Sequence, residues 1–533
     1  MSKQPAIELK NITKTFGKVV ANKNVNLTAY RGEILSILGE NGSGKTTLMN
    51  MISGIYFPDE GQIFIDGKEA LIASPKDAFD YKIGMIHQHF KLVDVFSAAE
   101  NIVLGIEDKK YNLTTSTEEI KKISSQYGFE LTPEKKIYTM SVSEKQTVEI
   151  IKVLYRGADI LILDEPTAVL TPQETEKLFD VLRRMRDDGK CIIIITHKLH
   201  EVLSLSDRVS VLRKGEYVGT VNTSETNENE LTEMMVGKKV SLNIQRNEPK
   251  NTEERLTVNS ITCVDRVGAT VLDNVSFTAK SGEILGIAGI AGSGQRELLE
   301  SIAGLQRLEF GDIFYFDPKT NKKESLRDKT PMQIRQMGVR LSFVPEDRLG
   351  MGLVGNMDIV DNMMLRSYSK GHSFFLKRKS PKDLAMKIIN DLEVVTPSAS
   401  TPVRRLSGGN VQKVLLGREI KAGPNVIVTA YPVRGLDINS SYAIYNILNE
   451  QKKDGVGILF VGEDLDVMMA LCDKILVLCH GKVMGVVHAH KTSKEELGLM
   501  MTGALDYKDE KSFGIAKDSQ FDNEASMGGE LSE

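Results

Sequence analysis

The stretch Gly39–Thr47 (GENGSGKTT) fits the pattern G-x-x-x-x-G-K-[ST], which is typical of a loop that binds phosphate groups. Its glycines let backbone N–H groups turn inward around phosphate oxygens, and a following helix adds the positive end of its dipole. Lys45 would reach the β- and γ-phosphates, and the Thr46 hydroxyl would join the shell of a Mg²⁺ ion. The residues predicted to bind a nucleoside triphosphate here are Gly39, Glu40, Asn41, Gly42, Ser43, Gly44, Lys45, Thr46 and Thr47.

The alternative interpretation of this stretch is a glycine-rich turn that contains a lysine by chance. The two flanking segments favour a phosphate loop. The apolar run Ile34–Leu38 predicts a buried strand, and Thr47–Ile52 predicts the first turns of a helix. This strand–loop–helix context is the one that the motif requires.

Two carboxylates follow a second apolar run, Ile160–Leu163. Such a buried strand would deliver Asp164 and Glu165 at its C-terminal end, where open α/β sheets bind ligands. Asp164 suits an outer contact to Mg²⁺, and Glu165 suits polarising an attacking water as a general base. The alternative interpretation is a solvated strand end.

Three further side chains could complete a site for hydrolysis. His197 ends the next predicted strand, Ile192–Thr196, and could touch the γ-phosphate. Gln88 follows a strand-like run and could contact both the metal ion and the attacking water. Phe16 lies upstream, where its ring could stack on adenine, although a lone aromatic residue belongs more often to the core.

The chain contains an internal repeat. RGEILSILGENGSGKTTLM around Lys45 recurs as SGEILGIAGIAGSGQRELL around Gln295, 250 positions later. MSVSEKQTVEI from Met140 recurs as LSGGNVQKVLL from Leu406, 266 positions later, and ILILDEP is echoed by VIVTAYP. The repeat predicts two homologous domains at 1–240 and 255–505, joined by a short polar linker at 241–254. A polar tail at 506–533 is predicted to be disordered.

Composition places the 533 residues in the soluble globular class, with 41% hydrophobic and 26% charged residues. The net charge of −4 gives no sign of a nucleic-acid partner. The four scattered cysteines lack metal-binding spacing and are predicted to be core thiols. No run of 18 apolar residues occurs, and Met1–Ala6 shows no signal-peptide pattern.

Strand and helix patterns alternate in the first half. The predicted strands include Ala6–Leu9, Val25–Tyr30, Gln62–Ile65 and Cys191–Ile195, and a helix is predicted at Thr175–Arg186. The alternation favours an α/β core with a largely parallel sheet. Ser116–Glu119 also fits a capping box, which predicts a helix over Glu118–Tyr127 with Ser116 as its N-cap.

Five features follow one another in the first half: the phosphate loop, Gln88, the segment that starts at Met140 (called the signature), the DEP sequence at the end of the Ile160–Leu163 strand, and His197. This order resembles the nucleotide-binding domain of ABC (ATP-binding cassette) ATPases, and the resemblance occurs twice along the chain. The resemblance implies two tandem P-loop NTPase domains, each with a mainly parallel sheet, an antiparallel β subdomain and a helical subdomain. It implies head-to-tail closure, with each ATP between the phosphate loop of one domain and the signature, LSGGQ, of the other. A Gly-Gly turn at a helix N-terminus could grip a γ-phosphate in that way.

The two halves depart from the family pattern in opposite ways. The first half keeps the phosphate loop (the Walker A motif) and the strand that ends in Asp164 and Glu165 (the Walker B motif). It has Val142 and Ser143 in place of the two signature glycines. The second keeps the signature, whose predicted ATP contacts are Ser407, Gly408, Gly409 and Asn410, and the interface aspartate, Asp437. The residues that replace Phe16, Lys45, Thr46, Gln88, Asp164, Glu165 and His197 in the second half are Arg266, Gln295, Arg296, Glu346, Ala430, Tyr431 and Glu463. We therefore predict one competent composite site and one degenerate site in each chain.

The segments GIAGSGQREL, VPEDR, LSGGNVQK and PVRGLD are similar to those of fused double-cassette ATPases of bacterial sugar and nucleoside importers. GMIHQHFKLVDVFSAAENIVLG and YRGADILILDEPTAVLTPQE resemble the nucleoside branch more than the ribose or galactose branch. The resemblance implies an ATPase that uses ATP and Mg²⁺ and lies peripherally at the cytoplasmic face of the cell membrane. Its implied partners are integral membrane permease subunits, met by Phe90–Glu100 and Leu349–Asp361, and indirectly an extracytoplasmic substrate-binding protein.

Three other functions fit the sequence less well. An ABC ATPase of translation or repair would favour two competent sites, a long charged linker and a basic surface. A phosphotransferase of the phosphate-loop superfamily would leave the signature and the repeat unexplained. A catalytically dead regulatory subunit would not need both Lys45 and Glu165. Import of ribose or galactose remains the main alternative to import of nucleosides.

Overall fold

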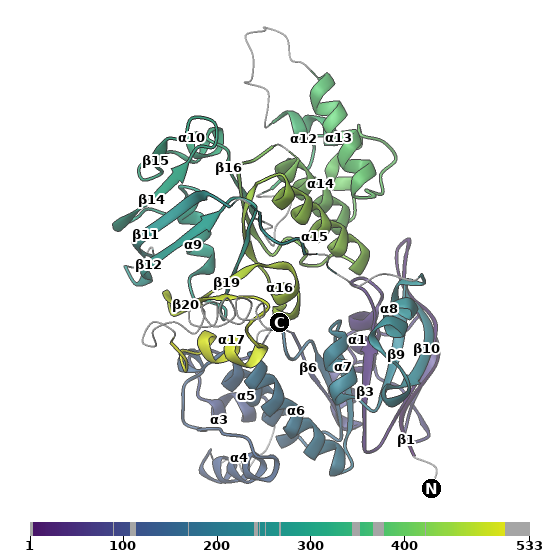
Figure 1. Ribbon diagram of the computed structural model, residues 1–533. Helices are drawn as coiled ribbons and strands as arrows, with labels where there is room; N and C mark the ends of the chain where they lie inside the picture. Colours follow the sequence, from purple (N-terminus) through teal and green to yellow (C-terminus); the bar gives the residue numbers. More distant parts are fainter. Residues whose placement is uncertain are drawn as a thin grey trace, which may run out of the picture. The chain divides into compact units, whose positions relative to one another are not determined.

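The structure is a computed structural model that describes residues 4–88, 90–106, 113–168, 170–238, 244, 246–250, 252–265, 268–343, 352–365, 378–421 and 423–506 (Figure 1). The chain divides into two compact units, Met1–Leu242 (unit 1) and Asn243–Glu533 (unit 2). Within the described ranges, every helix is too short or too polar to cross a membrane.

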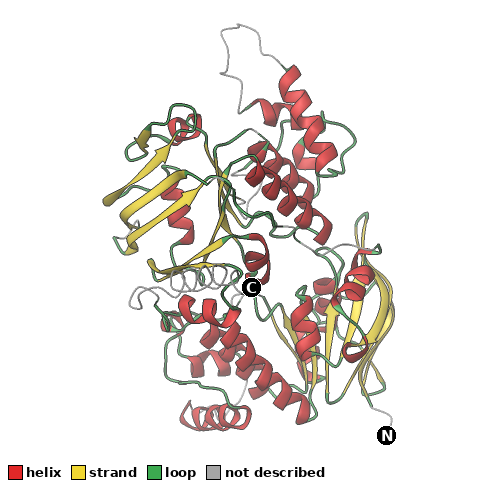
Figure 2. Ribbon diagram, viewed as in Figure 1, coloured by secondary structure: helices red, strands yellow, loops and turns green. Residues whose placement is uncertain are grey.

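Unit 1 contains an antiparallel four-stranded sheet, in the order β2-β1-β4-β5, and a six-stranded sheet, in the order β10-β9-β3-β8-β7-β6. The larger sheet is parallel except for β10, which runs antiparallel to β9 (Figure 2). The strands are β1 (Pro5–Phe16), β2 (Val19–Tyr30), β3 (Glu33–Leu38), β4 (Glu60–Ile65), β5 (Lys68–Ala70), β6 (Ile83–Ile86), β7 (Ile160–Asp164), β8 (Cys191–Ile195), β9 (Arg208–Arg213) and β10 (Glu216–Asn222).

Every residue of β3, β7 and β8 is buried, as expected for central strands of a parallel sheet that is covered on both faces. Ile160 and Ile162 of β7 pack into one core cluster, and Leu161 and Leu163 pack into another. Successive side chains of a strand point to opposite faces, so one apolar run supplies both clusters.

The helices of unit 1 are α1 (Lys45–Ile52), α2 (Pro75–Asp80), α3 (Ala98–Val103), α4 (Leu113–Tyr127), α5 (Val142–Tyr155), α6 (Pro172–Asp187), α7 (Leu199–Leu205) and α8 (Glu228–Val236). Three of them, α3, α4 and α5, pack around a separate apolar cluster that includes Ile102, Ile120 and Ile151. This cluster forms the helical part of the unit.

Unit 2 repeats the topology of unit 1. Its sheets have the orders β12-β11-β14-β15 and β16-β17-β18-β13-β19-β20, and the larger sheet is again parallel except for its last strand. The strands are β11 (Glu254–Val264), β12 (Thr270–Lys280), β13 (Ile284–Ala288), β14 (Phe310–Phe316), β15 (Lys323–Ser325), β16 (Val339–Phe343), β17 (Val426–Ala430), β18 (Gly457–Val461), β19 (Lys474–Cys479) and β20 (Lys482–His488). The helices are α9 (Gln295–Ile302), α10 (Pro331–Gln336), α12 (Ile359–Met364), α13 (Lys379–Asp391), α14 (Gly408–Ile420), α15 (Ile438–Lys453), α16 (Leu465–Leu471) and α17 (Lys494–Met501).

The predicted α/β fold with parallel sheets is confirmed, and all four cysteines are free and buried, as predicted. The capping box at Ser116 is wrong. Helix α4 already begins at Leu113, and Ser116 is buried inside it, on the same face as Ile120 and Ser124. The buried face extends one turn further towards the N-terminus than the polar sequence suggests, so Ser-x-x-Glu here lies within a helix and does not start one.

Two residues of the predicted linker at 241–254, which we call the connector, are hydrogen-bonded to the fold of unit 2. Lys452 Nζ donates to the carbonyl oxygen of Asn247 and forms an ion pair with Asp473 Oδ1 at 2.6 Å. Arg246 Nη1 donates to the carbonyl oxygen of Cys472 at 2.9 Å. These residues of the connector are therefore fastened to the fold of unit 2. The predicted tail, apart from Asp506, lies outside the described residues.

Candidate active site

The phosphate loop joins β3 to α1 and requires glycine at its end. Gly42 and Gly44 have φ angles of +80° and +95°, a region that favours glycine. A Cβ atom on Gly44 would lie 2.3 Å from the carbonyl oxygen of Ala21. The Asn22 side chain donates to the Gly44 carbonyl oxygen at 3.2 Å, and α1 begins at the next residue. The loop therefore presents the N-terminus of α1 as an anion site.

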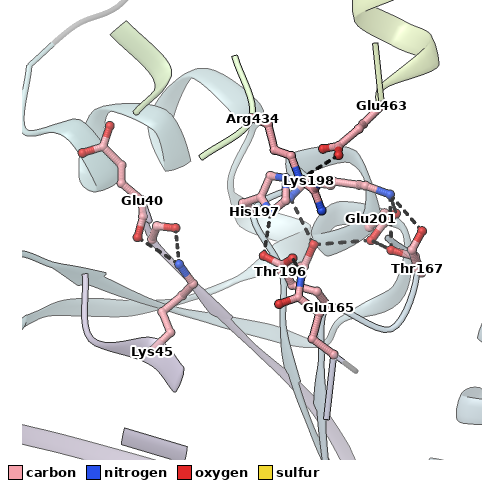
Figure 3. A network of polar contacts seen from close by, with 12 residues as sticks. Glu40, Lys45, Glu165, Thr167, Thr196, His197, Lys198, Glu201, Arg434 and Glu463 are labelled. Carbon is pink, nitrogen blue, oxygen red and sulfur yellow. Dashed lines mark hydrogen bonds and ion pairs between the residues drawn. The ribbon is translucent and has the colours of Figure 1, made fainter. Parts of the chain in front are cut away.

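Lys45 is buried, and its ammonium group lies over the loop. Its Nζ donates to the carbonyl oxygens of Gly39 at 2.7 Å and Glu40 at 2.9 Å (Figure 3). Burial lowers the pKa of Lys45, and the nearby carboxylates of Glu165 and Asp164 oppose this shift. Phosphate oxygens would form stronger, charge-assisted bonds to this ammonium group than the two carbonyls do.

Thr46 and Asp164 supply neighbouring oxygen atoms. Asp164 ends β7, and the nearby Thr46 side chain favours the ionised form of its carboxylate. Burial and the charge of Glu165 raise the pKa of Asp164 to about 6. A hydroxyl and a carboxylate are the oxygen ligands that Mg²⁺ prefers, and a bound cation would favour the ionised form of Asp164. The donor set thus fits the metal ion predicted here.

Glu165 is held at the sheet edge by its backbone and by both carboxylate oxygens. Its φ angle is +47°, and its N–H donates to the carbonyl oxygen of Ile195 at 2.9 Å. Its Oε2 accepts from Gln88 Nε2 at 2.8 Å, and its Oε1 lies 2.9 Å from His197 Nδ1. The hydrogen bond to His197 and the charge of Lys45 lower the pKa of Glu165, so the carboxylate stays ionised. Three residues predicted separately from the sequence therefore meet at one point.

A second polar network, which the sequence analysis missed, fixes the turn that carries His197. Glu201 of α7 accepts from Thr167 Oγ1 at 2.7 Å and from Lys198 Nζ at 2.9 Å, and the Lys198 N–H donates to Thr196 Oγ1 at 3.1 Å (Figure 3). These bonds join the segment after β7 to the segment after β8. No local sequence pattern marks such long-range pairs.

Phe16, at the end of β1, is 44% exposed, which excludes the core interpretation. Its ring packs edge-to-face against Tyr56, with ring centroids 5.2 Å apart. Exposure leaves the ring available for stacking on a base.

The corresponding loop of unit 2 keeps the backbone conformation, with φ angles of +83° at Gly292 and +98° at Gly294, but has no lysine at the position of Lys45. Gln295 is buried like Lys45, and its Nε2 donates to the carbonyl oxygen of Ile290 at 3.2 Å. Arg296 is turned along α9, where its Nε bonds Glu300 at 2.7 Å. The neutral amide of Gln295 lacks the positive charge that Lys45 offers to phosphate.

The catalytic positions of unit 2 show the same loss. Tyr431 has a φ angle of +50° and donates its N–H to Val461, so its backbone matches that of Glu165. Burial raises the pKa of Tyr431, which therefore stays a neutral phenol, and Ala430 offers no ligand where unit 1 has Asp164. Glu463 pairs with Arg434 at 3.1 Å (Figure 3). Arg266 and Glu346, also predicted to belong to the degenerate set, lie outside the described residues.

The two signature helices differ in what their N-termini hold. Helix α14 is capped by Ser407, whose Oγ accepts from Asn410 Nδ2 at 2.8 Å, and its first turn has no acidic residue. A Cβ atom on Gly409 would meet only the Leu436 side chain, at an ordinary 3.7 Å. The packing of unit 2 thus does not require glycine at 409, and the glycine leaves room for an approaching group. Gly408 begins the helix.

Helix α5 instead carries its own anion at its N-terminus. Glu144 accepts from the Ser141 N–H at 2.8 Å and from Lys135 Nζ at 2.6 Å, while Ser141 caps the helix. Val142 and Ser143 follow the cap. This use of Glu144 was missed, although Ser-x-x-Glu before an apolar run is the sequence signal of a capping box.

Asp437 caps helix α15. Its Oδ1 accepts from the Ser440 N–H at 2.8 Å, and its Oδ2 accepts from Ser440 Oγ at 2.7 Å. This role lies within unit 2, and the predicted interface role of Asp437 stays a prediction.

Comparison with known proteins places these features in one family. The sequence model of the family described as "ABC transporter" matches residues 22–168 and 272–429. The guanosine import ATP-binding protein NupO of Bacillus subtilis is 41% identical over 504 residues, covering 93% of this chain and 97% of that protein. The nucleoside import ATP-binding protein NupA of Lactococcus lactis is 38% identical, covering 94% and 99%. The glucose import ATP-binding protein TsgD13 of Haloferax volcanii is 38% identical, covering 95% and 97%. The chain therefore belongs to the ABC transporter family, whose ATP-binding domain it carries twice.

Proposed function

We propose that this chain is the ATP-hydrolysing subunit of an importer for nucleosides. The observation that carries the hydrolytic role is the convergence of Gln88, Glu165 and His197 beside the Lys45 loop. Support for the substrate class comes from the NupO and NupA relatives, which are named for guanosine and nucleoside import and align along nearly their whole length. Import of a simple sugar is the second candidate, favoured by the relative named for glucose import.

Each residue of the unit 1 site has a distinct task in hydrolysis. Lys45 and the amides at the start of α1 hold the terminal phosphates. Ionised Glu165 accepts the proton of the attacking water, while Gln88 and His197 keep the carboxylate in place. Thr46, Asp164 and Gln88 would hold Mg²⁺, which supplies charge neutralisation on the phosphate oxygens when bound.

The two units are complementary in the residues they retain, and this supports one competent composite site. Unit 1 has the charged residues for hydrolysis, and unit 2 has a signature helix that begins with two glycines and has no acidic residue in its first turn. In the head-to-tail arrangement of the family, Ser407, Gly408 and Gly409 would face the γ-phosphate held by Lys45. The second site would combine the neutral Gln295 with α5, whose N-terminus already holds the Glu144 carboxylate and its partner Lys135 in place of a phosphate group.

Aspartate placed at each signature helix tests this pairing. We expect Gly409→Asp to lower kcat for ATP hydrolysis by about 10²-fold or more, because an added carboxylate repels the γ-phosphate where a donor group should stabilise it. The equivalent change in unit 1, Ser143→Asp, is expected to alter kcat little, because Glu144 already places a carboxylate there. Steady-state ATPase assays of both variants give the comparison, and equal losses would contradict a single competent site.

Both units also keep a matching segment after the outermost parallel strand of the larger sheet, β6 in unit 1 and β16 in unit 2, and we assign these segments to contacts with a permease. In unit 1 the Asn101 side chain accepts from the Val93 N–H at 2.7 Å and donates to the Val93 carbonyl oxygen at 3.1 Å. In unit 2 Asn362 does the same with Val354, at 2.9 Å and 3.1 Å. Val93 and Val354 are exposed beside these clamps. Unit 2 has this pair of asparagine hydrogen bonds although it lacks the catalytic residues. This supports two permease contacts for each chain.

These contacts would place the chain peripherally at the cytoplasmic face of the cell membrane, with integral membrane permease subunits as direct partners. An extracytoplasmic substrate-binding protein would deliver the substrate. Closure and reopening of the two units during the ATP cycle would drive the permease.

Uptake of radiolabelled guanosine, ribose and glucose tests the substrate class. In cells that lack the gene, we expect guanosine uptake to be lost and sugar uptake to persist. The wild-type gene should restore guanosine uptake, whereas a gene with Glu165→Gln, which supplies the same subunit without hydrolysis, should not. Loss of sugar uptake alone would move the chain to the sugar importers and leave the ATPase assignment intact.

A further inference from the structure

A carboxylate outside the phosphate loop fastens the tip of β1 that carries Phe16. Asp59 Oδ2 accepts from the Thr15 N–H at 2.7 Å and from Thr15 Oγ1 at 2.8 Å, and Asp59 Oδ1 accepts from Lys14 Nζ at 2.8 Å. Lys14 Nζ also donates to the carbonyl oxygen of Phe57 at 2.7 Å. These bonds lower the pKa of Asp59 to about 2, so the carboxylate stays ionised at any physiological pH.

Tyr56 supports the same ring from the side. Its ring meets Phe16 edge-to-face at an interplanar angle of 71°, and Lys14 Nζ lies 5.6 Å from the Phe16 ring centroid. Tyr56 follows the C-terminus of α1, where its N–H donates to the Asn50 carbonyl oxygen at 3.1 Å. The helix that presents its N-terminus to phosphate is thus tied at its other end to the exposed aromatic ring.

Unit 2 has different residues at the positions of Tyr56 and Asp59. Gln306 stands 250 positions after Tyr56, and its Nε2 donates to the carbonyl oxygen of Val264 at 2.7 Å. Glu309 stands at the position of Asp59, with one more methylene group. The aromatic pair and the aspartate therefore occur in the unit that has the complete hydrolytic site.

We propose that Asp59 and Tyr56 are positioning residues for ATP: they hold the half-exposed Phe16 ring so that it can stack on the nucleotide base. Core packing does not fix this ring, because Phe16 is 44% exposed at a strand end. Its orientation therefore depends on the Asp59 bonds and the Tyr56 contact. The inference rests on the proposed ATPase function of unit 1 and on base stacking by Phe16.

The test compares ATP with tripolyphosphate, which has the phosphate chain but no base. For hydrolysis by the full-length chain, we expect Asp59→Ala to raise KM for ATP about 3- to 10-fold, because part of a base–aromatic stacking interaction is lost. The value of kcat and the inhibition constant of tripolyphosphate should stay unchanged. Tyr56→Ala should act in the same direction, and Tyr56→Phe should restore the wild-type KM because the ring contact remains.

Asp66→Ala is the matched control. Asp66 is also a carboxylate of unit 1 that clamps a strand end, through Arg31 Nη2 at 2.7 Å, but it lies near the start of β1, where its N–H donates to the carbonyl oxygen of Ala6, ten positions before Phe16. If Asp59→Ala behaves like Asp66→Ala, or if the tripolyphosphate constant rises together with KM, the proposal is overturned. An unchanged KM in Phe16→Ala would also overturn it by removing its premise. Failure of nucleoside uptake would alter none of these outcomes, so the two failures are distinguishable.

Discussion

Replacing Glu165 with glutamine is expected to lower kcat for ATP hydrolysis by about 10³-fold while ATP still binds. A positioned general base contributes roughly 10²- to 10⁴-fold, and glutamine cannot accept the proton of the attacking water. Glutamine has the same shape, so the bonds of Lys45 to its own loop should remain intact. Steady-state ATPase rates measure the loss, and gel filtration with labelled ATP measures the retained nucleotide.

Gln295→Ala provides the comparison from unit 2. Gln295 occupies the position of Lys45, but its amide carries no charge and donates to Ile290 within its own loop. Its removal is expected to leave kcat nearly unchanged. Equal loss of activity in the two variants would refute a model with one hydrolytic site, whereas loss in Glu165→Gln alone supports it. A Glu165→Gln chain that no longer retains ATP would show that the substitution had damaged binding as well as proton transfer.

The sequence predicted an element correctly where its local pattern is compatible with only one type of structure. The run Ile160–Leu163 is apolar on both faces and short, and only a central strand of a covered sheet buries both faces of so short a segment. The phosphate loop is similar, because Gly44 has no room for a Cβ atom and Lys45 follows it at the start of α1. The order of these motifs along the chain then determined the family and the repeat.

The side-chain contacts of the site were harder to predict, because they join segments far apart in the chain. Gln88 and Glu165 are 77 positions apart, and only the adjacency of β6 and β7 brings them together. The Ser-x-x-Glu pattern was ambiguous in a different way. It forms a capping box at Ser141 but lies inside α4 at Ser116, because the extent of the buried face decides where each helix begins.

The polar connector shows the same limit of local patterns. Its composition predicted only that the linker is short and polar, whereas the structure shows that Lys452, more than 200 positions later, binds the Asn247 carbonyl oxygen. Nothing in the sequence near Asn247 marks that contact. A buried cation elsewhere in the fold can therefore fasten a segment that looks unstructured by composition.

Lys452→Ala is expected to destabilise unit 2 by about 3–5 kcal/mol, because it leaves a buried carboxylate without its partner. Lys452 is 2% exposed and pairs with Asp473, which in turn accepts from the N–H of Ile284, the first residue of β13. Strand β13 leads into the loop that carries Gln295. Denaturant unfolding of the full-length chain should show one transition shifted to lower concentration, with the transition of unit 1 in place. Proteolysis of the connector near Asn247 should also become faster.

Lys453→Ala is the control for this prediction. It shows how much stability is lost when a lysine at the end of α15 is removed without breaking the buried ion pair. Lys453 pairs with Glu450 at 2.6 Å, but both side chains are largely exposed, and such surface pairs contribute only about 0–1 kcal/mol. The two variants remove the same side chain from adjacent positions of one helix, so helix propensity changes alike in both. A cost for Lys452→Ala no greater than that for Lys453→Ala would mean that solvent or a rearranged neighbour satisfies Asp473. In that case the bonds of Lys452 to Asp473 and to the connector would contribute little to the stability of unit 2.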